Sequence, residues 1–231
     1  DQSAVIVTRD GVVVTDPINS EAAEWLKAKI AEQFDAPITH LVYSHSHGDH
    51  ASGGQVFGDV TVIAHANAPE AIDGVAIDRR IASPENIEIG GKTLEIVPLV
   101  KGHGNDMLAM VVRPENVAFV VDVVSPKRVP FRDFAGADVD GLAQQIATVE
   151  GLDFEIMLPG HGPRGDKSDA TEAREYMEWL RGQVEAGLDA GKSVEEIKAS
   201  IDWSPYADWS MAAEWGPLNV EGMANWIGKD S

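Results

Sequence analysis

The chain has 231 residues and no cysteine, and its 38 acidic and 18 basic side chains give a formal net charge of -20. This charge would be repelled by a phosphate backbone, and no local basic stripe offsets it, so we expect no nucleic acid partner. The longest apolar runs, such as residues 117–121, are far shorter than the roughly 20 residues of a membrane span. We therefore expect a soluble protein with one sizeable core and a small-molecule substrate.

The first part of the chain predicts a mixture of strands and one helix. Residues 4–15 alternate as a β-hairpin around Asp10-Gly11. Apolar residues then recur at helical spacing over 20–34, and short apolar runs at 38–43 and 60–64 predict strands. Residues 73–86 and 125–137 are expected to form loops that, with the tail, build the substrate pocket.

The second part predicts two further hairpins and then helices. The strand pairs are 86–89 with 93–99 and 107–112 with 117–121. A helix is expected over 141–149 and a strand over 154–158. Beyond residue 165 the pattern is helical, with Asp169 and Glu172, and then Ser193 and Glu196, as capping boxes. Three hairpins make a purely parallel sheet improbable, so the pattern favours a layered α/β or α+β fold.

Three histidines and an aspartate directly follow the strand 38–43, at positions His45, His47, Asp49 and His50. Imidazole nitrogen and carboxylate oxygen are ligands that zinc and similar divalent metals favour. A turn that leaves a strand can aim such side chains at a common point, whereas a regular strand alternates them between two faces. Six residues cannot fill two coordination shells, so further ligands must come from distant segments.

The candidate distant ligands are His103, Asp122 and His161. Each histidine follows a predicted strand and is flanked by glycines, which allow the backbone to approach a crowded site. Asp122 ends the apolar run 117–121, where a buried strand emerges. Strand ends are where a sheet scaffold presents functional loops, so we expect these side chains to converge.

With these residues in place, the chain resembles the metallo-β-lactamase-fold hydrolases. The resemblance rests on His-x-His-x-Asp-His at 45–50, then His103, Asp122 and His161 in the family's order, with Asp16 at the family's first motif. The resemblance covers about residues 4–165. Within the family, a ligand set that has a bridging Asp and no Cys is similar to the glyoxalase II and lactonase branches. It implies an α+β four-layer αββα sandwich, formed by about 1–165 of a single domain 1–231, with a helical tail 166–231 packed on it.

The resemblance also implies the roles of the candidate residues. His45, His47 and His103 would hold one metal, Asp49, His50 and His161 a second, and Asp122 would bridge them. The cofactors would be two divalent ions, for which we expect zinc, with iron or manganese as alternatives. A bridging hydroxide would attack an ester-like, lactone, thioester or β-lactam carbonyl, and Asp49 would also move a proton as a catalytic residue.

Three alternatives to a binuclear hydrolase of carbonyl compounds stay open at this point. Persulfide dioxygenases share much of the glyoxalase-type signature but use a single iron, which would make the protein an oxidoreductase. Flavo-diiron oxygen reductases fit less well, because their motif has a Glu where His47 stands. A nuclease of the same superfamily is disfavoured by the charge of -20.

Two further features could shape the substrate site. The loop 125–132 carries Lys127, Arg128 and Arg132, the local cluster of positive charge after Asp122. These residues are candidates for binding a substrate carboxylate or phosphate, and the alternative is a solvated loop. The tail holds five of the six tryptophans, which predicts either an aromatic wall over the site or packing on the sandwich or on a second subunit.

The oligomeric state stays open, and a homodimer through the Trp-rich tail is one arrangement. The compartment stays open as well, because the numbered chain begins at Asp1 and not at Met. We expect the cytoplasm, or the periplasm after removal of a signal. Of the other polar residues, His65 is expected near the start of a short helix, and Asp16 is expected to accept hydrogen bonds beneath the metal ligands.

Overall fold

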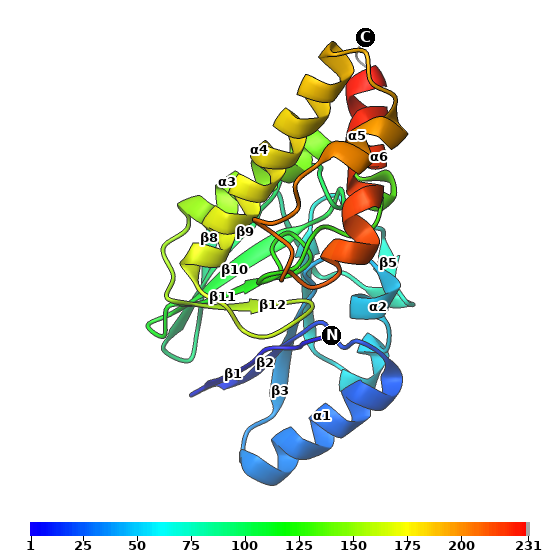
Figure 1. Cartoon of the computed structure of the whole chain (residues 1–231). Coiled ribbons are helices and arrows are strands. Elements are labelled where there is room, and N and C mark those ends of the chain that lie inside the picture. Colours follow the sequence, from blue (N-terminus) through cyan, green and yellow to red (C-terminus); the bar gives the residue numbers. More distant parts are fainter. Residues whose placement is uncertain (230–231) are drawn as a thin grey trace.

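The computed structural model describes residues 1–229 and contains two five-stranded sheets packed face to face (Figure 1). The first sheet has the order β1-β2-β3-β4-β7, with β1 antiparallel to β2 and the other neighbours parallel. Its strands are β1 (Val5–Thr8), β2 (Gly11–Thr15), β3 (Ile38–Val42), β4 (Thr61–His65) and β7 (Arg79–Ile81).

The second sheet has the order β12-β11-β10-β9-β8 and is antiparallel except for the pair β11 and β12. Its strands are β8 (Glu85–Ile89), β9 (Lys92–Pro98), β10 (Leu108–Arg113), β11 (Val117–Val120) and β12 (Ile156–Pro159). The three hairpins expected from the sequence are β1–β2, β8–β9 and β10–β11, and all three are present.

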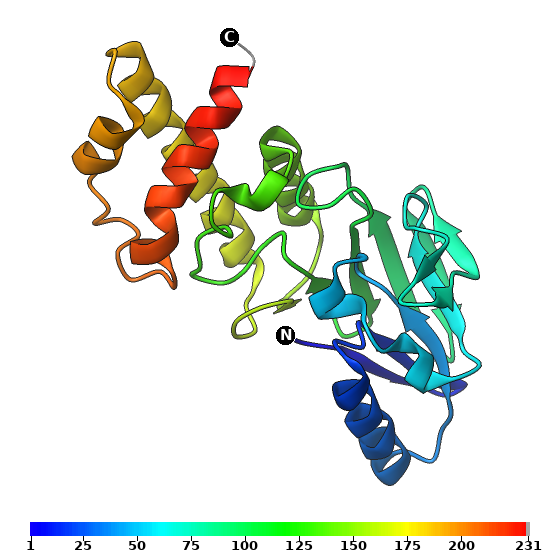
Figure 2. The same cartoon turned by 90° about the vertical axis from the view of Figure 1, so that its right-hand side faces the viewer.

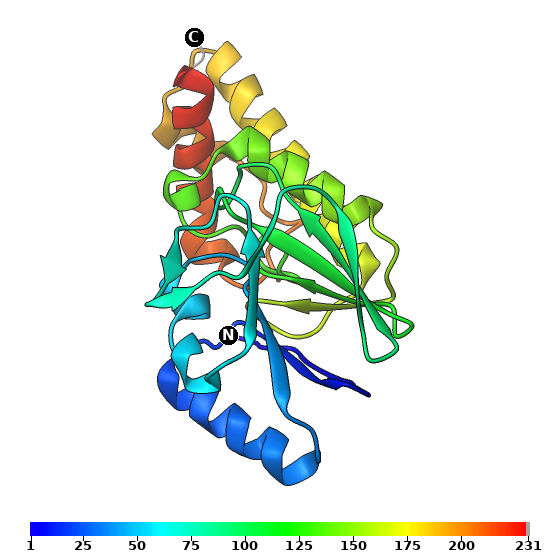
Figure 3. The ribbon, with the colours of Figure 1, turned by 180° about the vertical axis from the view of Figure 1, so that it is seen from behind.

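Helices cover the outer faces of both sheets, and Figure 3 shows α1 and α3 on opposite sides of the pair. The longer helices are α1 (Ser20–Gln33), α3 (Val139–Gly151), α4 (Lys167–Asp189), α5 (Val194–Ser200) and α6 (Ala212–Lys229). Short helical turns are α2 (Gly48–Ala51), η1 (Gly54–Phe57) and η2 (Phe134–Gly136). Helices α4 to α6 gather at one end of the molecule, away from α1 (Figure 2). Within residues 1–229, no helix has the length and apolarity that a membrane crossing requires.

Three apolar clusters fill the spaces between these layers. One lies between the sheets and includes Ile63, Leu94 and Phe119. A second joins the outer face of the first sheet to α1, and a third joins the second sheet to α3, α4, α5 and α6. The expected α+β four-layer αββα arrangement with a helical C-terminal region is therefore confirmed.

Three local predictions were wrong. Helix α4 begins earlier than expected, because Asp166 caps it and forms the capping box with Asp169. His65 does not precede a helix: it ends β4, and its Nδ1 atom accepts a hydrogen bond of 2.9 Å from the backbone N–H of Asn67 in the turn that follows. The expected loop 73–86 instead contributes short strands, including β6 (Val75–Ala76), which pairs with β5 (Ala71–Ile72).

Candidate metal centre

Asp16 anchors the turn that carries the histidine motif. It lies at the end of β2, fully buried, with a positive φ of 22°. Its two carboxylate oxygens accept hydrogen bonds from the backbone N–H and the hydroxyl of Ser44, at 2.7 and 2.6 Å. Burial raises the pKa of Asp16 to about 7, although the bonds from Ser44 oppose that rise. The residue therefore fixes the start of the turn in which His45 and His47 lie, which is the structural task expected of it.

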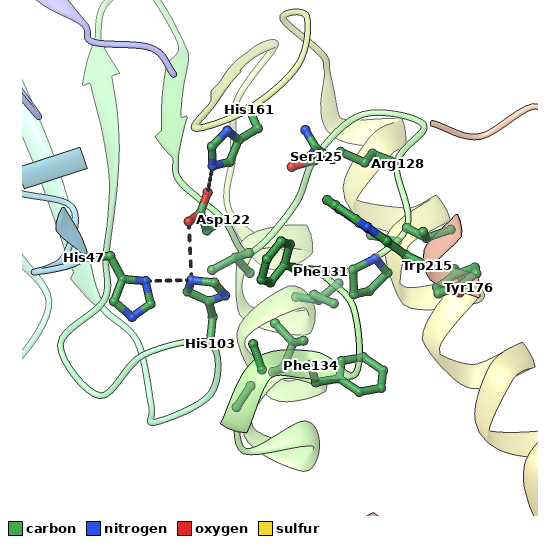
Figure 4. Close-up of a pocket in the computed structure, with 18 of the residues that line it drawn as sticks. His47, His103, Asp122, Ser125, Arg128, Phe131, Phe134, His161, Tyr176 and Trp215 are labelled. Carbon is green, nitrogen blue, oxygen red and sulfur yellow. Dashed lines mark hydrogen bonds and ion pairs between the residues drawn. The ribbon is translucent and has the colours of Figure 1, made fainter. Parts of the chain in front are cut away.

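The first cluster of donor atoms combines His45, His47, His103 and Asp122, whose ligand atoms lie within 4.8 Å of one another. The Nε2 atom of His103 is 3.2 Å from Nδ1 of His47 and 3.3 Å from Oδ2 of Asp122 (Figure 4). The Nε2 atom of His45 is 3.7 Å from the same Oδ2. Three imidazoles and a carboxylate from three separate loops thus converge on one point.

The second cluster combines Asp49, His50, His161 and Asp1, again with ligand atoms within 4.8 Å. The Oδ2 atom of Asp49 lies 3.5 Å from Nε2 of His50 and 3.6 Å from Nε2 of His161. Asp1 lies on the other side of the His161 ring, with its Oδ1 3.0 Å from Nδ1. No sequence pattern pointed to Asp1, because it stands outside every motif and 160 residues from its partner.

Asp122 lies between the two clusters and is shared by them. Its Oδ2 atom is 3.2 Å from Nε2 of His50, in addition to its contacts with the first cluster, and its Oδ1 atom is 3.3 Å from Nε2 of His161. The residue adopts a left-handed φ of 61°, two residues after the end of β11. Gly160 allows the close approach of the β12 loop, because a Cβ atom there would meet Asp122 Oδ1 at 2.7 Å and a His50 ring carbon at 2.9 Å.

The donor set fits divalent metal ions. Among residues 1–229, four buried polar atoms at this point have no hydrogen-bond partner of normal geometry: Nε2 of His45, both ring nitrogens of His50, and Oδ1 of Asp122. Buried polar groups in folded proteins are normally paired, because an unpaired one costs about 1–3 kcal/mol. A metal ion accepts electron pairs from imidazole and carboxylate groups, so it would satisfy these atoms together.

The electrostatics favour the protonation states that metal ligands need. Burial lowers the pKa of His45 to about 2, and it lowers the pKa values of His47 and His161 as well. Burial opposes ionisation of Asp122, but the adjacent His103 and His50 rings outweigh it and lower the pKa of that carboxyl. His50 is the exception, because the contact with Asp122 outweighs burial and raises the pKa of that imidazole. Burial thus favours the neutral form of His45, His47 and His161 beside an ionised Asp122, and neutral imidazole and ionised carboxylate are the forms that bind metal.

Gln145 holds the loop that carries His103. This fully buried side chain projects from α3, and its Oε1 atom accepts a hydrogen bond of 2.9 Å from the backbone N–H of His103. Its Nε2 atom donates to the carbonyl oxygen of Val100 at 2.6 Å. Gly102 lies against the same side chain, where a Cβ atom would collide with it. Sequence reasoning missed Gln145, because a glutamine in a helical pattern carries no signal of its own.

A cavity of about 600 Å³ opens beside the metal centre. One wall consists of His47, Asp49, His103, Asp122 and His161. The other walls come from the segment 123–137, from α3, and from the tail, including its helix α4. The loop 73–86, expected to help build the pocket, contributes none of the lining residues. His45 and His50 lie buried behind the first wall.

Of the three candidate substrate-binding cations, Arg128 alone is in the cavity lining. Its guanidinium stacks 4.8 Å from the centre of the Trp215 ring. Lys127 forms an ion pair with Glu172, and Arg132 lies over Phe131, 5.2 Å from the ring centre. The structure therefore places one cation, and not the whole loop, beside the metal centre.

The tail contributes both a wall and packing. Trp209 and Trp215 line the cavity, as the expectation of an aromatic wall required. Trp179 and Trp203 instead pack in the tail, with ring centres 5.3 Å apart, and Trp226 packs against the apolar cluster there. Two of the tryptophans therefore form a wall of the cavity, and three pack in the apolar cluster that joins the tail to the second sheet, whereas packing on a second subunit stays a prediction.

Comparison with known proteins gives a family for this arrangement. The model of the metallo-beta-lactamase superfamily matches residues 2–161. A hydroxyacylglutathione hydrolase from Erythrobacter litoralis is 31% identical over 123 residues, which are 49% of this chain and 47% of that protein. The thioesterase pkgB from Emericella nidulans is 26% identical over 145 residues, 61% of this chain and 40% of that protein. The matched segments span less than half the length of these two relatives.

Solved structures show the same fold at low sequence identity. A metallo-beta-lactamase from Pontibacter korlensis has a TM-score of 0.67 at 22% identity, covering 75% of this chain and 85% of that one. The sec-alkylsulfatase Pisa1 from a Pseudomonas species has a TM-score of 0.74 at 15% identity, covering 96% of this chain and 46% of that one. The second match extends through the helical tail. Fold, sequence match and converging donor residues agree that this chain belongs to the metallo-β-lactamase superfamily.

Proposed function

We propose that the protein is a binuclear metal-dependent hydrolase that cleaves an ester-like, lactone, thioester or β-lactam carbonyl bond. The position of Asp122 carries the proposal. One carboxylate contacts His45 and His103 of the first cluster and His50 and His161 of the second, at 3.2–3.7 Å. A single-metal site would need only one of these clusters, whereas two adjacent metals would use both.

The chain's own residues divide into three tasks. His45, His47 and His103 would hold the first ion, Asp49, His50 and His161 the second, and Asp122 both, with zinc as the expected metal. Bound ions would supply an acidified water and polarise the scissile carbonyl. Asp49 is a solvent-exposed ligand candidate, with 56% of its side chain exposed, and it lines the cavity. It can therefore carry a proton between the cavity and the leaving group.

Arg128 would orient the substrate. Its stacking on Trp215 holds a positive charge in the cavity wall near His161, whose pKa that charge helps to lower. A substrate with a carboxylate or phosphate could place that group on the guanidinium while its carbonyl lies at the metals. Within the carbonyl class, the sequence similarity to a hydroxyacylglutathione hydrolase and a thioesterase favours thioesters.

The test is a substrate panel of thioesters, lactones, esters, β-lactams and phosphoesters. It is run with zinc-loaded protein and with metal-free protein as the control. We expect zinc-dependent hydrolysis of at least one carbonyl substrate. No hydrolysis in the panel, together with consumption of oxygen by an iron-loaded sample given a persulfide, would contradict the proposal and favour the dioxygenase alternative.

A further inference from the structure

We infer that the cavity selects substrates that carry a bulky apolar group, such as an alkyl chain or a ring, next to the scissile bond. The inference rests on the proposed hydrolytic function and specifies its substrate class. Figure 4 shows His47, His103 and Asp122 on one side of the cavity, and Phe131, Phe134, Tyr176 and Trp215 on the other. A carbonyl at the metals would therefore point the rest of the molecule toward an aromatic wall.

The lining away from the metals is predominantly apolar. Helix α3 contributes Leu142 and Ile146, the loop before it contributes Val123, Val129 and Phe134, and the tail contributes two indoles. Burying apolar surface against such a wall is worth about 25 cal/mol per Å². A volume of about 600 Å³ is in the range of pockets that enclose drug-sized ligands, so it would hold far more than an acetyl group.

The wall offers few groups for a polar substrate. Besides the indoles and the metal-facing residues, the polar side chains in the lining are Ser125, Arg128 and Tyr176. The Tyr176 hydroxyl already donates a 2.6 Å hydrogen bond to Asn219 Oδ1, so Ser125 and Arg128 are left to receive polar groups of the substrate. A substrate with many polar groups beyond the one that Arg128 can bind would leave them unpaired against this surface, which costs free energy. Selection against such substrates follows from the lining itself.

The wall is also held rigidly in place. Asn219 of α6 is fully buried, and its amide nitrogen donates to the carbonyl oxygens of Pro130 (3.0 Å) and Arg132. The N–H of Ser210 donates to the carbonyl oxygen of Lys127 at 2.7 Å. The tail and the segment 127–132 therefore form one connected surface, and an apolar ligand would enter a chamber that is already formed. Preorganisation of this kind reduces the entropy lost on binding.

Two series of thioesters test the inference. One lengthens the acyl group from S-ethyl thioacetate to S-ethyl thiohexanoate, and the other lengthens the thiol to S-hexyl thioacetate. Because the chain has no cysteine, a thiol reagent measures the released thiol without a protein background. Full burial of one methylene is worth about fourfold in binding, so half of that gain gives about 16-fold over four methylenes. We expect kcat/KM to rise by about this factor in at least one series.

A matched pair of variants locates the effect in the cavity. Ala173 of α4 lines the chamber, whereas Ala186 of the same helix is exposed. Ala173→Leu reduces the volume of the chamber. In the series that shows the gain, the ratio of kcat/KM for the longest substrate to kcat/KM for S-ethyl thioacetate should therefore fall at least fivefold. Ala186→Leu adds the same side chain outside the chamber and should leave the ratio unchanged. Urea unfolding of both variants checks that the helix has kept its packing.

The outcomes separate this inference from the proposed function. Zinc-dependent hydrolysis whose kcat/KM does not rise in either series, or that is confined to substrates without an apolar group, would overturn the inference. The proposed hydrolytic function would be unaffected by that result. An unchanged ratio in Ala173→Leu would also overturn it. Absence of zinc-dependent hydrolysis throughout the panel would remove the proposed function, and the inference with it.

Discussion

Replacement of Gln145 by methionine should weaken the metal centre without touching a ligand. Methionine has nearly the same length and volume as glutamine but cannot make hydrogen bonds, so the fit against Gly102 is kept. The change removes the acceptor of the His103 N–H and the donor to the Val100 carbonyl oxygen. The loop between these two residues is then free to shift, and His103 shifts with it.

The magnitude follows from the exposure of the two backbone groups. His103 is half-buried, so its unpaired N–H should cost about 1–2 kcal/mol. Val100 is 43% exposed, so water can replace the lost donor and the cost there should be about 0.5 kcal/mol. We expect the variant to lose about 2 kcal/mol of unfolding free energy. Loss of a hydrogen-bonded support behind a metal ligand typically lowers metal affinity 10- to 100-fold.

Urea unfolding of the metal-free protein and zinc competition with a chromophoric chelator measure the two effects. The matched control is Gln144→Met, which makes the same change at the neighbouring, exposed position of α3. We expect the control to behave as wild type in both assays. A Gln145→Met protein that folds and binds two zinc ions with wild-type affinity would refute the view that Gln145 positions His103.

Three other replacements test separate parts of the structure. Asn219→Leu should destabilise the fold by about 2–4 kcal/mol in urea unfolding, because it leaves the buried Tyr176 hydroxyl and the part-buried Pro130 carbonyl without their partner; a loss below 1 kcal/mol would show that water replaces the amide. Asp1→Asn should weaken the second zinc about tenfold in the chelator assay while sparing the first, because Asp1 contacts Nδ1 of His161; equal weakening of both would contradict this. Asp49→Asn should lower kcat far more than it raises KM, and a kcat that persists at full zinc occupancy would exclude a proton-transfer role.

Local patterns in the sequence were sufficient to predict most of the elements. The hairpin turns at Asp10-Gly11 and Gly90-Gly91, and the capping box of Ser193, are set by neighbouring residues, and the structure contains all three. The strands β5, β6 and β7 were missed because they have only two or three residues each, too few to show a period. The start of α4 was misplaced because two overlapping acidic patterns compete there, and Asp166 makes the cap.

The metal-binding residues and their support differ in how far sequence could predict them. The seven proposed ligands stand in motifs at strand ends, so their convergence followed from the fold class. Gln145 and Asp1 act through contacts between segments distant in the chain, at 42 and 160 residues from their partners. The cavity likewise depends on how the tail meets the loop 125–137, which no local pattern determines. Arg128 could be named from its position, but its separation from Lys127 and Arg132 could not.

The number of zinc ions that each chain binds tests the central claim most directly. Metal-free protein is titrated with zinc while bound metal and hydrolysis of the preferred carbonyl substrate are measured on the same sample. We predict two zinc ions per chain in the wild type, with hydrolysis that follows occupancy of both sites, and loss of tight binding at both sites in Asp122→Asn. Zinc binding that saturates at one ion per chain, or tight binding at both sites that persists in Asp122→Asn, would contradict the shared-carboxylate centre.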